Sequence, residues 1–387
     1  MSTLRLPDRH GNLADYQLLG AAPAWPETPP AFNRIAYAAA HVVIAPEAQT
    51  ANWLEKPAID WDATLAYRHH LWQLGFKVAE AMDTAQRGMG ISWPIARELI
   101  IRSLAAAKAT PGADLAAGVG TDQLDANAAT SLDQVIAAYE EQMELVEQHG
   151  GRIVLMASRA LAKVATGSED YLRVYNRLLQ QSQGKVILHW LGDMFDPALT
   201  GYWGSTDIDR AADTVLAIIN ANPGKVEGIK MSLLSKEREI AFRQRLPEQV
   251  KMYTGDDYNY PDLIEGEQGH YSHALLGIFD AIAPAASQAL NALAQGDRAQ
   301  YHRILAPTVP LAREIFKAPT QYYKAGVVFL AWLNGHQRHF AMAGGMQAAR
   351  EISHYAEIFR LADQAGLLHQ PELALQRMQA LLKIYGY

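Results

Sequence analysis

Short apolar runs alternate with amphipathic segments through the middle of the chain, and this alternation predicts strands that are separated by helices. The runs are nearly continuous in apolar residues, as in parallel strands that are covered on both faces. Eight of them are strand-like, at residues 34–44, 76–81, 114–118, 152–157, 185–189, 226–230, 250–254 and 269–274. Eight strands in this spacing predict a (β/α)8 barrel, an α/β fold.

The segments between these runs place their apolar residues with the period of an α-helix. They predict helices at residues 61–74, 94–107, 132–148, 169–181 and 208–221. After the last strand the pattern is helical, at residues 284–295, 298–316, 321–332, 347–364 and 373–385. A doubly wound open sheet is the alternative, but its usual glycine-rich turn after the first strand is missing here.

The chain therefore divides into an N-terminal extension (residues 1–33), a (β/α)8 barrel (34–297) and a C-terminal helical region (298–387). Four prolines within residues 20–32 predict an extended lead-in to the barrel, because proline lacks an N–H donor and restricts its neighbour. Helices that follow a barrel commonly pack on its flank or on a second subunit. We therefore expect a homo-oligomer, either a dimer or a tetramer.

Composition excludes several classes of protein. With 49% hydrophobic and 19% charged residues among 387, the chain is not of the disordered type. The absence of cysteine excludes disulfides, thiolate catalysis and Cys-ligated metal. A net charge of −7 argues against a nucleic-acid surface, and no apolar stretch is long enough to span a bilayer. We expect a soluble, cytoplasmic protein that acts on a small molecule, with no nucleic-acid or membrane partner.

Chemistry in such barrels gathers at the carboxyl ends of the strands, and Lys230 stands at the end of the sixth. A lysine desolvated at that place has a lowered pKa, so its neutral amine can attack a carbonyl and form a Schiff base. The alternative is a strand-end lysine that extends to solvent. Position alone favours this second interpretation.

Three motifs reverse that preference. They are Gly228-Ile229-Lys230-Met231-Ser232, then Thr254-Gly255-Asp256-Asp257, then a G-x-x-S stretch at residues 269–272 that continues to Pro284. In this order they resemble strands 6, 7 and 8 of the dihydrodipicolinate synthase / N-acetylneuraminate lyase family. The resemblance implies a class I, aldolase-type barrel in which Lys230 forms the Schiff base, so that a covalent lysine imine takes the place of a cofactor.

The chain also departs from the family pattern. In the strand-2 loop only Thr84 matches the two hydroxyls of the family, because Ala85 stands at the second position, and Arg87 is the substitute expected to hold a carboxylate. His189 stands where the family has its proton-transferring tyrosine, and a neutral imidazole serves as general acid or base. These changes argue against dihydrodipicolinate synthesis itself.

We therefore predict a Schiff-base-forming lyase, an aldolase or dehydratase, that acts on a keto acid or a sugar-derived ketone. The predicted catalytic residues are Lys230, His189 and Thr84. The predicted substrate-binding residues are Asp83, Arg87, Arg159, Ser232, Asp256, Ser272 and His273.

Two other functions stay open. Asp83, His189 and His273 lie on one predicted face, and a carboxylate with imidazoles suits a divalent metal, as in a sugar isomerase or hydrolase. The second is a catalytically inactive barrel that binds a sugar.

Overall fold

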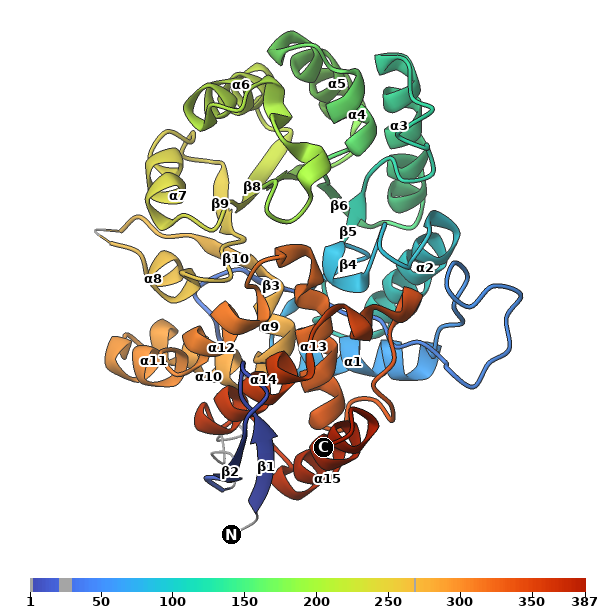
Figure 1. Ribbon diagram of the computed structural model, residues 1–387. Coiled ribbons are helices and arrows are strands. Elements are labelled where there is room, and N and C mark those ends of the chain that lie inside the picture. The colour runs from blue at the N-terminus through green and yellow to red at the C-terminus, as the bar shows by residue number, and fades with distance from the viewer. Residues whose placement is uncertain (1–2, 21–29, 268) are drawn as a thin grey trace.

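Eight parallel strands close into a barrel in the computed structural model, which describes residues 3–20, 30–267 and 269–387 (Figure 1). Each strand pairs with its neighbours in the sequence, and the last pairs with the first. The strands are β3 (Ala36–Ala39), β4 (Lys77–Glu80), β5 (Leu115–Val119), β6 (Arg152–Leu155), β7 (Val186–Leu191), β8 (Val226–Ser232), β9 (Lys251–Thr254) and β10 (His273–Leu276). The predicted (β/α)8 fold is confirmed.

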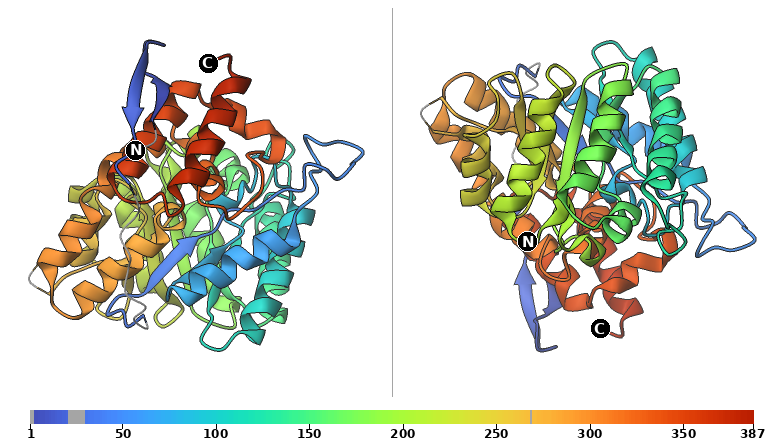
Figure 2. Two further views of the ribbon diagram at one scale, coloured as in Figure 1. Left: turned by 90° about the horizontal axis from the view of Figure 1, so that it is seen from below. Right: turned by 90° about the horizontal axis from the view of Figure 1, so that it is seen from above.

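Helices surround the barrel, as the two turned views show (Figure 2). Those that follow the strands are α1 (Trp61–Gln73), α2 (Trp93–Ala109), α3 (Leu132–Gln148), α4 (Arg159–Val164), α5 (Ser168–Gln181), α6 (Ile208–Ala221), α7 (Lys236–Arg243), α8 (Tyr260–Glu265) and α9 (Ile278–Ala281). The bounds of α3 and α6 are as predicted, because the side chains of Ser131 and Asp207 cap their first turns.

The last strand differs from its prediction in position. The sequence indicates a strand over residues 269–274, whereas β10 covers His273–Leu276. Its carboxyl end is therefore Leu276, which Gly277 follows, and His273 stands at its amino end. The continuous apolar run Ala274–Leu276 forms the buried part of the strand, and the polar residues before it lie in the preceding loop.

The C-terminal helical region covers the barrel beside α1 and α9 (Figure 1). It consists of α11 (Arg298–Leu305), α12 (Thr308–Ile315), α13 (Tyr323–Leu333), α14 (Ile352–Gln364) and α15 (Pro371–Ile384), and α10 (Ala283–Ala294) precedes it. One predicted helix, residues 298–316, is broken into α11 and α12 at Pro307, because proline cannot donate to the helical hydrogen bonds.

An antiparallel hairpin, β1 (Thr3–Pro7) and β2 (Leu13–Gln17), lies within the predicted N-terminal extension. It packs on α14, where the Tyr16 hydroxyl donates to Asp363 Oδ2 over 2.8 Å. Most of the proline-rich lead-in, residues 21–29, lies outside the described residues.

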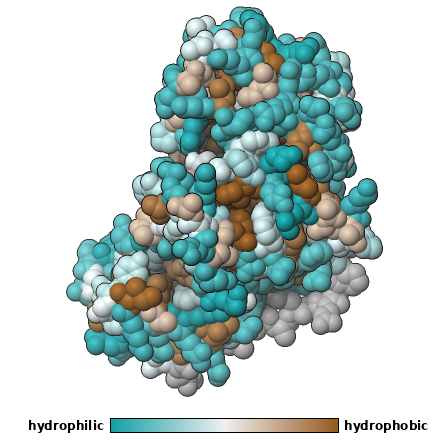
Figure 3. All heavy atoms as spheres, turned by 90° about the vertical axis from the view of Figure 1, so that its right-hand side faces the viewer, coloured by the Kyte–Doolittle hydropathy of each residue, from teal (hydrophilic) through white to brown (hydrophobic). Residues whose placement is uncertain are grey.

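The outer surface is mostly polar. Figure 3 shows hydrophilic side chains over most of one face, with hydrophobic atoms in small groups between them. Among the described helices, none combines the length and the apolar character that a membrane span requires.

Candidate active site at the barrel mouth

Lys230 and His189 lie side by side at the carboxyl end of the barrel. They are register partners on β8 and β7, and Leu191 pairs with Ser232 one layer further along. Both side chains are buried, with 8% of Lys230 and 1% of His189 exposed. The next strand comes close to them because it carries Gly255, where a Cβ would lie 2.2 Å from Ser232 Oγ and 2.8 Å from Lys230 Cε.

The amino group of Lys230 is desolvated and has no hydrogen-bond acceptor or ion-pair partner within the described part of the chain. Burial lowers its pKa, and the charges of Asp83 and Asp257 oppose that shift. The free-amine form, which is the nucleophile, is therefore more accessible here than in a lysine in water.

His189 is a neutral imidazole in this setting. Burial, and then the positive charge of Lys230, lower its pKa well below the usual value. Its Nε2 lies 3.4 Å from Ser232 Oγ, and its Nδ1 is buried with no hydrogen-bond partner among the described residues. The imidazole is thus free to accept a proton from a bound molecule.

The two aspartates after β9 have different hydrogen-bond partners. Asp256, a predicted substrate ligand, turns back into its own loop, where its Oδ1 accepts from the backbone N–H groups of Tyr258 and Asn259. The next carboxyl, Asp257, is the one that acts on Lys230. Its Oδ1 accepts from the Ile278 N–H over 2.8 Å, and burial raises its pKa to about 7. Of the two, Asp257 is therefore the carboxyl near the reactive lysine, and substrate binding by Asp256 stays a prediction.

In the strand-2 loop, which follows β4, the polar side chains are already hydrogen-bonded within the chain. Thr84 is buried in the short 3-10 turn Asp83–Ala85, and its hydroxyl is 2.7 Å from the hydroxyl of Tyr323 on α13. Arg87 is 6% exposed. Its guanidinium donates hydrogen bonds to Asp122, to Gln142 and to the Gly118 carbonyl. Arg87 also lines the neighbouring cavity, and its role as a carboxylate ligand stays a prediction.

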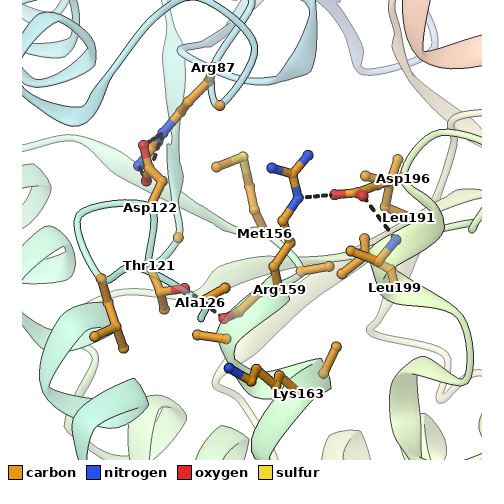
Figure 4. Close-up of a pocket in the computed structure, with 18 of the residues that line it drawn as sticks. Arg87, Thr121, Asp122, Ala126, Met156, Arg159, Lys163, Leu191, Asp196 and Leu199 are labelled. Carbon is orange, nitrogen blue, oxygen red and sulfur yellow. Dashed lines mark hydrogen bonds and ion pairs between the residues drawn. The ribbon is translucent and has the colours of Figure 1, made fainter. Parts of the chain in front are cut away.

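A cavity of about 710 Å³ lies at the ends of β4 to β7, and Asp83, Arg159 and His189 are among its lining residues. His189, the register partner of Lys230, connects the cavity with that lysine. Arg159 Nε donates to Asp196 over 2.6 Å, while its two terminal nitrogens point away from Asp196 (Figure 4). Figure 4 also shows Arg87 turned toward Asp122 at the side of the cavity.

Two predicted substrate ligands from strand 8 lie away from this mouth. Ser272 is buried before β10, where its hydroxyl donates to Glu239 and accepts from Arg243. His273 begins β10, and its Nδ1 accepts from the Ile35 N–H at the opposite end of the barrel. The structure does not bring either residue to the mouth, because the strand starts later than its sequence pattern indicates.

The same shift separates the residues of the alternative metal site. Asp83 and His189 are at the carboxyl end of the barrel, and His273 is at its amino end, so the three cannot bind one ion. Within residues 3–20, 30–267 and 269–387, no set of three or more His, Asp or Glu side chains is placed to hold a metal ion.

Sequence reasoning missed two residues of α13, Tyr323 and Lys324. Both are buried, at 4% and 2% exposed, and they come from the C-terminal helical region rather than from a strand end. Tyr323 packs over the end of β10, since a Cβ on Gly277 would lie 3.2 Å from its ring. No local pattern marks such residues, because only the docking of α13 brings them to the mouth.

Comparison with known proteins gives a family and a fold. The profile of a family described as "Protein of unknown function (DUF993)" matches residues 4–387. No curated protein gives a significant match.

Among solved structures, similar folds include YagE, a prophage protein of the dihydrodipicolinic acid synthase family from E. coli K12 in complex with pyruvate. Its TM-score is 0.65 and its identity 14%, over 87% of this chain and 100% of that one. A putative dihydrodipicolinate synthetase from Pseudomonas aeruginosa has a TM-score of 0.61 and 13% identity, over 84% and 99%. The Acinetobacter baumannii synthase with pyruvate has a TM-score of 0.61 and 15% identity, over 86% and 99%. The resemblance noted in the sequence is thus confirmed at the level of the fold.

Proposed function

The chain belongs to the family described as "Protein of unknown function (DUF993)", and within it we propose that this protein is a Schiff-base-forming lyase, an aldolase or dehydratase acting on a keto acid or a sugar-derived ketone. The observation that carries the proposal is the desolvated amino group of Lys230, which meets no acceptor in the described chain and stands beside His189. The shared fold with dihydrodipicolinate synthases supports the reaction class, and the substrate is proposed from the site.

The proposed reaction begins when the neutral amine of Lys230 attacks the substrate carbonyl. A carbinolamine forms and then loses its hydroxyl as water, which requires a proton donor. Asp257 suits this step, because its raised pKa of about 7 keeps part of the carboxyl protonated near neutral pH. The product is a positively charged imine on Lys230, which withdraws electrons from the neighbouring carbon atoms.

His189 is the proposed proton acceptor in the next step. Removal of a proton from the carbon beside the imine gives an enamine, which then expels a hydroxyl from the next carbon; that hydroxyl leaves as water with the proton that His189 took up. Removal of the proton from that hydroxyl instead turns its oxygen into a carbonyl and breaks the carbon–carbon bond, whose electron pair the imine accepts as an enamine. The cavity, with Asp83 and Arg159 in its wall, is the proposed place for the rest of the substrate. Ligand sites of roughly 300–1,000 Å³ are typical for small molecules.

Borohydride trapping tests the proposal, because reduction turns the imine into a stable amine. The protein is incubated with pyruvate, with hydroxyacetone and with a panel of keto-sugars, then reduced, and the adduct is located by intact mass and peptide mapping. We expect one adduct, on Lys230, that the variant Lys230→Met cannot form. Lys236→Met is the matched control, since Lys236 pairs with Asp262 on the surface.

Two results would overturn the proposal. One is the absence of an adduct with every ketone, and the other is an adduct on a different lysine. Binding of a keto-sugar without any adduct would favour the alternative of an inactive, sugar-binding barrel.

A further inference from the structure

The carboxylate of a keto acid needs hydrogen-bond donors, and the side chains expected to supply them are engaged elsewhere. Arg87 is held by Asp122, Gln142 and the Gly118 carbonyl, and the hydroxyl of Thr84 is bonded to Tyr323. The N–H groups of Arg87 and the hydroxyl of Thr84 are thus used within the chain and are not free to bind a ligand. The strand-2 loop therefore leaves the carboxylate without a strong partner.

Lys324, in the first turn of α13, has an ammonium group that is only partly satisfied. The side chain is 2% exposed. Its Nζ donates to the Gln321 carbonyl over 2.9 Å and lies 3.5 Å from Met89 Sδ, a weak acceptor. An ammonium has three N–H donors, so one oxygen acceptor among the described residues leaves it short of partners.

The charges that act on Lys324 all belong to the mouth of the barrel. Asp83 and Asp196 favour its charged form, while Arg159 and Lys230 disfavour it. Burial is the largest influence and lowers its pKa to about 8, so most of the group is still protonated at pH 7. Lys324 therefore offers a positive charge that acts on the charged groups of the mouth.

The balance of charge at the mouth favours an anionic ligand there. Asp196 is paired with Arg159 by a 2.6 Å bond. Asp83 then faces two lysines, because it acts on both Lys230 and Lys324. Asp257 supplies only part of a negative charge, since its pKa is raised to about 7. One positive charge is left without a full counter-ion, and imine formation on Lys230 retains it.

We propose that Lys324 binds the carboxylate of an α-keto acid while the ketone of the same molecule forms the imine with Lys230. This inference rests on the proposed function and deepens it, because it selects α-keto acids over neutral ketones as the substrate class. It also assigns a role to the C-terminal helical region, whose helix α13 completes the site.

The test compares two ketones that differ in charge. Pyruvate carries a carboxylate beside its carbonyl, and hydroxyacetone carries a neutral hydroxymethyl group. For each ketone, the concentration that gives half-maximal borohydride trapping on Lys230 is measured in the wild type and in Lys324→Gln, Lys324→Met and Lys324→Arg. Lys383→Gln, on the exposed end of α15, controls for the loss of one positive charge.

In Lys324→Gln and Lys324→Met we expect the half-maximal pyruvate concentration to rise by about 10- to 100-fold, the size of a lost charged hydrogen bond. We expect the value for hydroxyacetone to change by less than about threefold, and Lys324→Arg to recover part of the pyruvate affinity. An equal shift for both ketones would overturn the inference, and so would an adduct on Lys324 itself.

The proposed function can fail separately. If the wild type traps neither ketone, non-covalent binding is measured as the shift in melting temperature that each ketone causes. A shift with pyruvate that disappears in Lys324→Gln supports the carboxylate site even though the lyase proposal is then wrong. A shift that Lys324→Gln leaves unchanged, or no shift at all, overturns the inference.

Discussion

Two groups of buried polar side chains lie at the carboxyl end of the same barrel and differ in how they are bonded. The paired group, at the ends of β3, β4 and β10, consists of His41, Arg68, Glu80 and Asp280. The open group, at the ends of β7 to β9, consists of His189, Lys230, Ser232 and Asp257. Every one of these side chains is at most 8% exposed. Depth of burial therefore does not distinguish the two groups.

Bonding does distinguish them. In the paired group, Arg68 donates twice to Glu80 over 2.8 Å and also to the His41 carbonyl, while His41 Nδ1 is bonded to Asp280. Only His41 Nε2 lacks a partner within the described residues. In the open group, the side chains make one contact with one another, the 3.4 Å approach of His189 to Ser232.

The difference in hydrogen bonding indicates a different role for each group. A buried charge costs several kcal/mol unless partners compensate it, and the paired group contains its own partners. The open group has few partners: the Ile278 N–H donates to Asp257, and the amino group of Lys230 has no acceptor among the described residues. Groups with perturbed pKa values in a cleft are typical of functional sites. We therefore propose that the paired group stabilises the fold and that the open group takes part in chemistry.

The largest effect is expected from His189→Gln in the open group. Deuterium exchange at the methyl group of pyruvate, followed by NMR, reports proton removal from the carbon beside the imine. We expect the exchange rate to fall by about 10²- to 10⁴-fold, the range for loss of a general base, because Gln cannot accept a proton. Trapping on Lys230 and urea unfolding are the controls and should stay close to wild type. A parallel loss of trapping would mean that His189 positions Lys230 instead.

The paired group should show the opposite behaviour. Glu80→Gln leaves the Arg68 charge buried without compensation, and we expect the free energy of unfolding to fall by about 3–5 kcal/mol. Lys230→Met, which removes an unpaired charge from the open group, should change it by less than about 1 kcal/mol or increase it. Urea unfolding of both variants measures the two values. Equal losses would erase the distinction between the groups.

The sequence predicted the barrel and the places of Lys230 and His189, because both stand on long apolar strands whose ends are clear. It misplaced Ser272 and His273, because the predicted strand began in the polar loop that precedes β10 and so ended too early. The pairing of Arg87 with Asp122 was also beyond prediction, since both are loop residues whose contact depends on the turn between β5 and α3. Lys324 reaches the site only through the docking of α13, which no local pattern encodes.

Tyr323 borders both groups, since the charges of Asp257 in one and Asp280 in the other act on its hydroxyl. Burial raises its pKa well above the usual value, which makes the phenol a poor acid. We expect Tyr323→Phe to reduce stability by about 1–2 kcal/mol, because Thr84 Oγ1 loses its partner. Pyruvate exchange should change by less than about threefold. Thr84→Val and the double variant complete a cycle, and an additive result would show that the two hydroxyls do not depend on one another.

The smallest effect concerns the pH at which the open group becomes reactive. A free lysine has a pKa near 10.5. Burial lowers the pKa of Lys230, so its ammonium loses the proton at a lower pH than that. The rate of pyruvate trapping should therefore rise with pH to a midpoint below 10.5. Asp257 stabilises the ammonium, so Asp257→Asn removes that attraction and should move the midpoint further down. The maximal rate should fall, because Asp257 is also the proposed proton donor for loss of water. Asp213→Asn, which alters an exposed carboxylate, is the control. A wild-type midpoint at 10.5 would show that Lys230 is hydrated, and the open group would then differ from the paired group only in its hydrogen bonds.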